Sequence, residues 1–537
     1  MISKGSQRVF SIFAGLFMAI SFLFSGPLDL ASAQVTVAIG QNFTASTLNV
    51  DSSAVPPDPN GFAGPLHYVE LINGRFSVYD KSTGSKVKTM TDLTFWNQAG
   101  LSFPSGWDVT DPRIFFDPAS QRWFASQVDF DPSGTVNTNR FLLAVSATAD
   151  PTGTWKALGI LSDPGGNNFA DFPTLGMDAQ AIYLGGDMFD SNSFPVGPTL
   201  LSIPKSSLTA APPTTNGMTW LGILNYDVRG DILQPAICLD GSDQGTVLST
   251  SGVGVDNSGN IITNNSLVSF RIQNVTGVQK ATLTAPSVLT VQPYTAPLDP
   301  TQPDNSSNLS DNDSRFSACV YEVGGVLYAV HGTQVGNRAA LRWYRIDASS
   351  HAILETGTVA DPVLDLFFPS IAANPAGTVV IGYNASSIST FVSSFALVGN
   401  TVGGVTTFGQ PLLLKSGVAS YQNTDSSGSS RWGDYSATCV DPSDPNVFWT
   451  IQEFPSSASR WSTQVTQLLT GFPTLFSSVS SNKIALSWSG TLFSLQTTED
   501  LAHPNWSAVS QTSSTNHGTV SVQLPVSAGA FFRLKGP

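Results

Sequence analysis

Short runs of alternating hydrophobic and polar residues recur along most of the chain, and each set follows a turn rich in Pro, Asp and aromatic residues. Seven such turns stand roughly fifty to eighty residues apart: Asp58-Pro59, Asp111-Pro112-Arg113, Asp171-Phe172-Pro173, Gln234-Pro235, Arg315-Phe316-Ser317, Phe368-Pro369-Ser370 and Asp434-Tyr435-Ser436. Strand-length runs of period two, bounded by turn residues, predict β-strands. Each opening turn therefore predicts a unit of three strands: a small-residue strand, a hairpin partner and a further alternating strand.

The alternating strands are the clearest part of each unit. We expect the hairpin partners at 122–125, 181–184, 326–329, 379–382 and 447–450. We expect the further strands at 76–79, 141–145, 199–203, 267–270, 341–344, 391–395 and 462–465.

A β-unit repeated at this period is typical of a propeller with loop insertions. Seven openings predict an all-β, seven-bladed β-propeller over residues 56–470, with six or eight blades as alternatives. A radial repeat would place all the opening turns on one face, around one axis. The polar segment 34–55 has no opening turn, and we expect it to add a strand to either the first or the last blade.

Beyond Gly471-Phe472-Pro473 the blade pattern stops. Shorter alternating runs replace it at 484–488, 493–495, 520–524 and 531–534. Such a set over residues 471–537 predicts a small C-terminal β-sandwich.

The first 33 residues have the features of a secretory signal peptide. Lys4 and Arg8 precede an apolar run at 9–24, and Ala31-Ser32-Ala33 offers a small-residue cleavage site. We therefore expect a secreted protein that is extracellular or at the outer cell surface, with no membrane span after cleavage. An uncleaved anchor is the alternative.

Composition narrows the classes of partner. Only 12% of the residues are charged and the formal net charge is −14. An acidic protein repels phosphate backbones, which argues against nucleic acid as a partner. Three cysteines, Cys238, Cys319 and Cys439, are too few for a disulfide framework. We expect buried structural thiols, with a Cys238–Cys319 bridge as the alternative.

Several longer strings are similar to those of a known group of proteins. They are 431–438, Asp441-Pro442, 449–453, Asp117-Pro118 with Arg122-Trp123, and 150–155. Over most of residues 56–470 the chain resembles uncharacterised secreted bacterial β-propellers, whose fold is similar to the sialidase-like superfamily. The tail resembles C-terminal β-sandwich modules of secreted bacterial proteins, through 486–488, 495–497, 504–506 and 531–534.

Resemblance to sialidases would imply an arginine triad that holds a substrate carboxylate, and a nucleophilic tyrosine near an acid/base aspartate. Planar guanidinium groups suit that task because each binds a carboxylate through two hydrogen bonds. Arg113, Arg315 and Arg431 all lie at openings, and Asp434 and Tyr435 follow Arg431. The Arg-Ile-Pro string of true sialidases is absent, and the aspartate-box glycine is shifted by one residue at Gly153.

The opening residues together have the composition of a sugar-binding floor. Carboxylates and guanidinium groups can bond sugar hydroxyls, and Phe172 and Phe316 offer apolar faces. Asp171 and Asp434, with Tyr435, are the candidate catalytic residues of a glycoside hydrolase or polysaccharide lyase. The alternative is that Asp-Pro and Asp-Phe-Pro only form turns.

A structural calcium ion is a second candidate. Asp129, Asp131 and Ser133 place oxygen atoms at alternate positions before Gly134, as at the start of a calcium loop. A solvated loop would explain the same residues. No other cofactor is indicated.

Two functions remain open on the sequence alone. One is glycan recognition, with cleavage of an acidic polysaccharide held by Arg113, Arg315 and Arg431. The other is a non-catalytic scaffold that binds glycans or envelope proteins. Propellers serve both uses, so the fold does not decide between them. Facing carboxylates at an open pocket would favour the enzyme, and a plugged axis would favour the scaffold.

Overall fold

A computed structural model describes residues 37–535 except 253–260, 277–279, 425–429, 472–474, 481, 490–492, 502, 517–518 and 526–529. The expected signal peptide, residues 1–33, lies outside the described residues. Strands dominate the described part, which also holds the short helices α1 (Asp92–Gln98), α2 (Lys205–Leu208) and α3 (Tyr226–Arg229). Among the described residues, no helix is long and apolar enough to cross a bilayer.

The chain from residue 38 to residue 469 forms a series of antiparallel sheets. The first contains β2 (Asn60–Ala63), β3 (His67–Ile72), β4 (Arg75–Asp80) and β5 (Lys86–Met90). The second contains β6 (Asp108–Asp117), β7 (Arg122–Phe130), β8 (Arg140–Ser146) and β9 (Trp155–Leu161). Another contains β25 (Asp365–Ala373), β26 (Thr378–Ser387), β27 (Thr390–Val402), β28 (Val405–Phe408) and β29 (Leu412–Lys415).

Two further groups of four strands share one nine-stranded sheet. They are β10 (Phe169–Met177), β11 (Ala181–Phe189), β12 (Pro195–Pro204) and β13 (Thr219–Ile223), and β21 (Tyr321–Val323), β22 (Val326–Val335), β23 (Arg338–Asp347) and β24 (Ile353–Val359). The short β15 (Ile237–Cys238) joins the groups because it pairs in parallel with both β10 and β21. Between them in sequence lies the sheet of β14 (Asp231–Pro235), β16 (Thr246–Thr250), β17 (Thr263–Gln273), β18 (Thr282–Leu283) and β19 (Ser287–Thr295).

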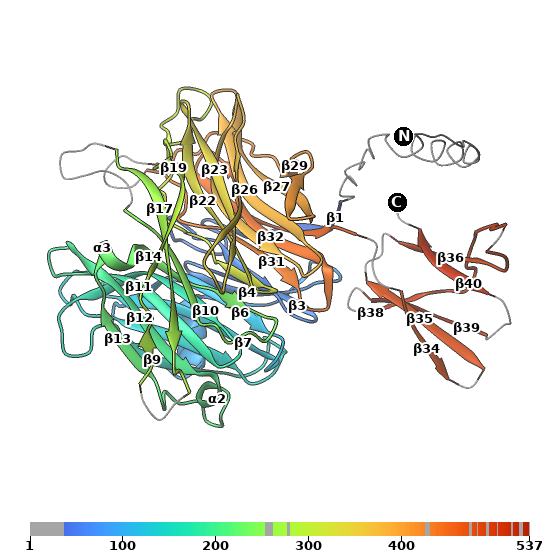
Figure 1. The fold of residues 1–537 in the computed structure, drawn as a ribbon, viewed down its shortest axis with the longest axis horizontal. Helices are drawn as coiled ribbons and strands as arrows, with labels where there is room; N and C mark the ends of the chain where they lie inside the picture. The colour runs from blue at the N-terminus through green and yellow to red at the C-terminus, as the bar shows by residue number, and fades with distance from the viewer. Residues whose placement is uncertain are drawn as a thin grey trace, which may run out of the picture. The chain divides into compact units, whose positions relative to one another are not determined.

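The last sheet of the series combines both ends of this region. It contains β31 (Ala437–Asp441), β32 (Asp444–Ser457), β33 (Arg460–Leu469) and the N-terminal strand β1 (Ala38–Thr47). β1 pairs antiparallel with β33, with Phe43 opposite Val465. Figure 1 shows the blue start of the described chain beside these orange strands. The lead-in segment therefore completes the last blade and not the first.

The innermost strands are neighbours in a closed circle, from β31 through β2, β6, β10, β14 with β15, β21 and β25 back to β31. Sheets arranged radially about one axis make a β-propeller. The number of seven blades stays a prediction, because β15 merges two of the expected blades into one sheet. β20 (Leu309–Ser310) and β30 (Ser430–Arg431) form a separate parallel pair.

Most sheets have four strands where the sequence predicted three. The expected partners and further strands lie within β7, β11, β22, β26 and β32, and within β4, β8, β12, β17, β23, β27 and β33. The unexpected fourth strands, such as β5, are largely exposed, whereas the third strand β8 is buried along almost its whole length. Exposure removes the apolar residues that make a strand recognisable from sequence.

Sharp turns at the openings explain the Asp, Pro and aromatic residues. Asp58, Asp111, Phe172, Ile232 and Phe368 all have a left-handed backbone, with φ between 45° and 60°. A register shift follows at four of them, where β6, β10, β14 and β25 bend into the ring. The fourth opening is thus centred on Ile232-Leu233, two residues before the predicted Gln234-Pro235; Asp231 precedes it, but Leu233 stands where the third opening has Pro173.

Small residues pack where inner strands approach one another. A Cβ on Gly176 would lie 2.3 Å from the backbone oxygen of Pro235. Cys439 is buried in the same ring, Cys238 is also buried, and Cys319 is half-buried; all three are free thiols. The alternative Cys238–Cys319 bridge is not formed.

The C-terminal residues form two small sheets. One contains β34 (Phe476–Ser480), β35 (Lys483–Ser489), β39 (Thr519–Pro525) and β38 (Ser514–Asn516), and the other β37 (Ser507–Ala508), β36 (Ser494–Thr498) and β40 (Phe531–Lys535). Leu486, Trp488, Leu495, Val520 and Val522 form a shared core, as in a β-sandwich. The boundary placed at 471 stays a prediction.

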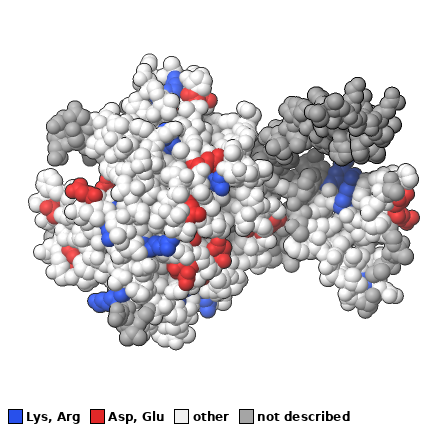
Figure 2. All heavy atoms as spheres, in the orientation of Figure 1, with Lys and Arg blue, Asp and Glu red and all other residues white. Residues whose placement is uncertain are grey.

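The described surface carries few charges. Figure 2 shows acidic and basic residues scattered among a majority of uncharged ones on the face in view. This agrees with the 12% charged residues of the whole chain.

Candidate functional site

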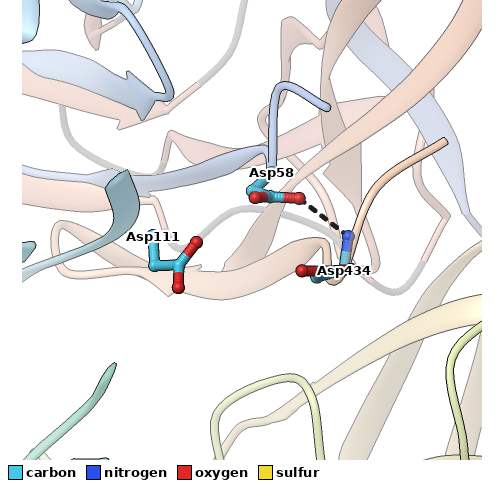
Figure 3. Close-up of side chains that lie close together, drawn as sticks. All are labelled: Asp58, Asp111 and Asp434. Carbon is cyan, nitrogen blue, oxygen red and sulfur yellow. Dashed lines mark hydrogen bonds between the residues drawn. The ribbon is translucent and has the colours of Figure 1, made fainter. Parts of the chain in front are cut away.

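Three opening turns bring carboxylates together near the propeller axis. Asp58 precedes β2, Asp111 lies at the bend of β6, and Asp434 precedes β31. One oxygen of each carboxylate lies within 4.8 Å of one oxygen of each of the others. Figure 3 shows the three side chains grouped from three separate segments of chain.

Asn73 of the first blade hydrogen-bonds the carboxylate of Asp58 and the backbone of Asp111. The Asn73 side-chain amide donates to Asp58 Oδ2 at 2.8 Å, and Asn73 Oδ1 accepts from the Asp111 backbone N–H at 2.9 Å. Asp58 Oδ1 accepts from the Asp434 backbone N–H at 2.8 Å, which is the dashed line in Figure 3. The left-handed turns at Asp58 and Asp111 are therefore fixed by side-chain contacts as well as by the chain.

Crowding and burial change the acidity of this group. Asp58 is 1% exposed and Asp111 6% exposed. Burial raises the pKa of Asp58 well above its usual value, and the Asp434 charge adds to this effect. Burial also raises the pKa of Asp111 well above its usual value, with further contributions from Asp171, Asp58 and Asp434. A divalent cation or a hydrogen-bond donor placed there would relieve the repulsion.

A more accessible rim surrounds the three carboxylates. Asp171 is exposed, and the side chains of Arg431 and Asp434 are 31% and 14% exposed. Arg315, 22% exposed, is bound by Asp313 through two hydrogen bonds, at 2.8 and 2.5 Å. Arg431 Nη2 lies 3.3 Å and 3.4 Å from the two oxygens of Asp434.

The rim and the buried carboxylates beneath it together have a clear excess of negative charge. The acids that influence one another's pKa there are Asp58, Asp111, Asp171, Asp187, Asp231, Asp313, Asp434 and Glu453. The arginines linked to them there are Arg315 and Arg431. Burial raises the pKa of Asp187 to about 7 and that of Asp231 to about 6, both with added contributions from neighbouring carboxylates.

Arg113 closes the axis beneath the rim. It is 1% exposed and donates to the backbone oxygens of Pro173 and Ser317, each at 2.9 Å. Its guanidinium carbon lies 3.6 Å from the ring centre of Tyr435 and 5.2 Å from that of Phe172. Tyr435 in turn donates to the Pro112 backbone oxygen at 3.1 Å. The axis is therefore plugged by a buried cation between aromatic rings.

The structure separates the sequence-predicted residues into three groups. Asp171, Asp434, Arg315 and Arg431 meet at the accessible rim. Arg113, Phe172 and Tyr435 lie in the plug beneath it, which makes a direct contact with a ligand unfavourable for them. Phe316 is fully buried beside His331 and Tyr344, in the hydrophobic core of another blade.

Both carboxylates of the predicted calcium loop have protein partners. Asp129 is 0% exposed, and its Oδ2 is ion-paired with Arg140 Nε at 2.7 Å. Asp131 instead accepts hydrogen bonds from Ser133 and from the backbone of Val136. Arg140 therefore balances the charge of the buried Asp129, and a cation at Asp129, Asp131 and Ser133 stays a prediction.

Sequence reasoning missed Asn73, Asp187 and Glu453. Asp187 lies opposite Asp171 in the β10–β11 pairing, and Glu453 lies in β32. Both are buried, at 8% and 2% exposed. For Asp187 the available signal was a single acid within the otherwise apolar strand β11. The position of both acids near the axis follows only from strand register.

No protein-family model matches the sequence, and neither does any curated protein. Among solved structures, a protein of unknown function from Dyadobacter fermentans DSM 18053 has a TM-score of 0.36 and 12% identity, over 69% of this chain and 97% of that one. The GH93 α-L-arabinofuranosidase of Fusarium graminearum, solved with arabinobiose, has a TM-score of 0.37 and 9% identity, over 80% and 97%. The Dos1 propeller has a TM-score of 0.36 and 7% identity, over 81% and 95%. Since these TM-scores lie below 0.5, the proposals that follow rest on the side chains of this chain.

Proposed function

We propose that the protein is a secreted glycan-recognising propeller that binds an uncharged carbohydrate at the axial rim, without cleaving it. The observation that carries the proposal is the ring of accessible or half-buried carboxylates above a plugged axis. Ionised carboxylates only accept hydrogen bonds, and sugar hydroxyls are abundant donors. Secretion is part of the proposal because of the pattern in residues 1–33.

The charge of the rim argues against the acidic polysaccharide that the arginines first suggested. Arg315 is already held by Asp313, and Arg431 lies against Asp434. A sugar carboxylate would have to displace these partners and approach several further acids. An uncharged sugar meets no such repulsion.

The burial of the inner carboxylates favours binding over hydrolysis. A glycosidase needs two carboxyl groups that both reach the scissile bond, about 5–5.5 Å apart in retaining enzymes and about 6.5–9.5 Å apart in inverting ones. Asp58 and Asp111 are only 1% and 6% exposed. A substrate at the rim therefore does not reach them as an acid and base pair.

Binding to a panel of soluble neutral and acidic polysaccharides would test the proposal, by affinity electrophoresis followed by calorimetry. Asp171→Asn removes an exposed rim charge with little change in shape. Asp243→Asn is the matched control, because Asp243 is exposed near the β10–β11 turn, at the far end of β10 from Asp171. We expect retardation by a neutral polysaccharide, weakened about tenfold by Asp171→Asn and unchanged by Asp243→Asn.

Three outcomes would contradict the proposal. Preference for acidic polysaccharides would overturn the inference from charge. Equal loss of binding in both variants, or in neither, would move the site away from the rim. Release of new reducing ends, followed by mass spectrometry, would show that the protein is an enzyme.

A further inference from the structure

The carboxylates of Asp58, Asp111 and Asp434 have the spacing of ligands around one ion. Each offers an oxygen within 4.8 Å of the others. A calcium ion holds its oxygen ligands at about 2.3–2.6 Å, so two ligands on opposite sides of one ion are about 5 Å apart. Three oxygens this close to one another can therefore surround one hard divalent cation, for which calcium is the probe (Figure 3).

A fourth carboxylate beside the group supplies an independent observation. Glu453 is 2% exposed, and its Oε1 has no hydrogen-bond partner among the described residues. It faces Asp58 across Gly433, where an added Cβ would lie 3.1 Å from Glu453 Oε2 and 3.8 Å from Asp58 Oδ1. A buried carboxylate oxygen without a donor is costly, and cation binding is one way in which proteins satisfy it.

The neighbouring protein cations do not balance this charge. Arg113 donates to backbone oxygens and packs between aromatic rings. Arg315 is bound by Asp313. Arg431 reaches Asp434, at 3.3 Å. Four carboxylates therefore lie near two guanidinium groups, of which Arg315 is already bound by Asp313, and a divalent cation would bring the group close to neutrality.

We propose that Asp58, Asp111 and Asp434, with Glu453 beside them, form a binding site for a hard divalent cation. The site joins the turns that open β2 and β6 to the turn before β31. The bound ion would link the first two sheets of the ring to the last one. The proposal does not depend on glycan binding, because it concerns the ion alone.

The test uses the full chain, freed of metal by chelation and dialysis, and titrated with calcium in a calorimeter. Terbium is a second probe, because it takes calcium sites and its emission is sensitised by a nearby indole, here Trp432 beside Gly433 and Asp434. The variants are Asp58→Asn and Asp434→Asn, which keep shape and remove charge. Asp131→Asn is the control, since Asp131 belongs to the turn that resembles a calcium loop.

We expect one calcium ion per chain, a rise in melting temperature with calcium, and sensitised terbium emission that calcium competes away. Asp58→Asn and Asp434→Asn should each weaken binding at least about tenfold, because even changes outside the ligand set cost about 10–100-fold in metal affinity. Asp131→Asn should bind like the unaltered protein. Circular dichroism in chelator checks that each variant is folded, and Asp434, at the half-buried edge, is the variant that best tolerates exchange.

Absence of calcium binding by the unaltered protein would overturn the proposal. So would equal affinity in the unaltered protein and the folded Asp434→Asn variant. Loss of binding in Asp131→Asn alone would assign the ion to the other loop.

Discussion

Asp187 offers a direct measure of how strongly the axial rim resists a further charge. It lies in β11, is 8% exposed, and its Oδ1 has no hydrogen-bond partner among the described residues. Burial raises its pKa to about 7; Arg315 lowers it in part, and Asp231, Asp171 and Asp313 raise it further. The perturbation is Asp187→Asn, which keeps the shape of the neutral acid and cannot ionise.

The sign of the effect follows from proton binding. Between the pKa of an unfolded aspartate, about 3.9, and the folded pKa of about 7, the folded protein holds a proton that the unfolded chain has lost. The stability contributed by protonated Asp187 is therefore full below about pH 4 and is lost as the pH rises to 7. At about 1.4 kcal/mol for each pH unit, the loss is on the order of 4 kcal/mol.

Urea unfolding from pH 4 to pH 8, followed by the tryptophan fluorescence of the propeller, measures this difference. Asp187→Asn should match the unaltered protein near pH 4 and exceed its stability increasingly up to pH 7–8. Asp190→Asn is the control: hydrogen bonds from Phe194 and Asn192 lower the pKa of Asp190, so above about pH 5 it is charged in the folded and in the unfolded state. A stability difference between Asp187→Asn and the unaltered protein that does not change with pH would refute the reasoning.

Two further predictions concern the packing of the ring. Arg113→Met removes two charge-assisted hydrogen bonds and the cation stacked between aromatic rings, and it leaves two buried carbonyl groups without this donor. The free energy of unfolding should fall by about 3 kcal/mol or more, measured by urea denaturation. An unchanged unfolding midpoint would contradict the role of Arg113 in closing the axis. Gly176→Ala would push a methyl group into the Pro235 backbone and should cost about 2 kcal/mol or more in the same assay. Gly409→Ala, whose added Cβ would meet its nearest atom at 3.6 Å, should be close to neutral, and equal losses in the two variants would rule out the steric cause.

The alternation of apolar and polar residues, and the Pro, Asp and aromatic residues of the turns, predicted the repeat because both depend only on residues close together in the sequence. A strand such as β8, buried between neighbouring sheets, keeps its apolar residues wherever the blade lies in the ring. The fourth strands were missed because they are exposed, and the fourth opening was misplaced because Ile232, after Asp231, adopts the left-handed turn without a following proline.

The candidate site was predicted only in part, for a different reason. Asp434, Arg315 and Arg431 were expected at the openings, and they are there. Which side chains face outward depends on the bend of each inner strand: Asp111 turns toward the carboxylate group, whereas Arg113, two residues later, enters the plug. That distinction comes from strand register and three-dimensional packing, which no local pattern in the sequence encodes.

The pairing of β1 with β33 bears on the order in which the molecule can be built. The Ser46 backbone N–H donates to Thr463 Oγ1, a residue 417 positions later in the chain. During synthesis the first strand must therefore wait, without its partner, until almost the whole ring has left the ribosome. The entropy of such a long closure grows only with the logarithm of its length, by about 0.6 kcal/mol for each doubling. Late closure is therefore inexpensive in free energy. Between the synthesis of β33 and its pairing with β1, however, β33 is an open edge that β1 of a second chain could occupy.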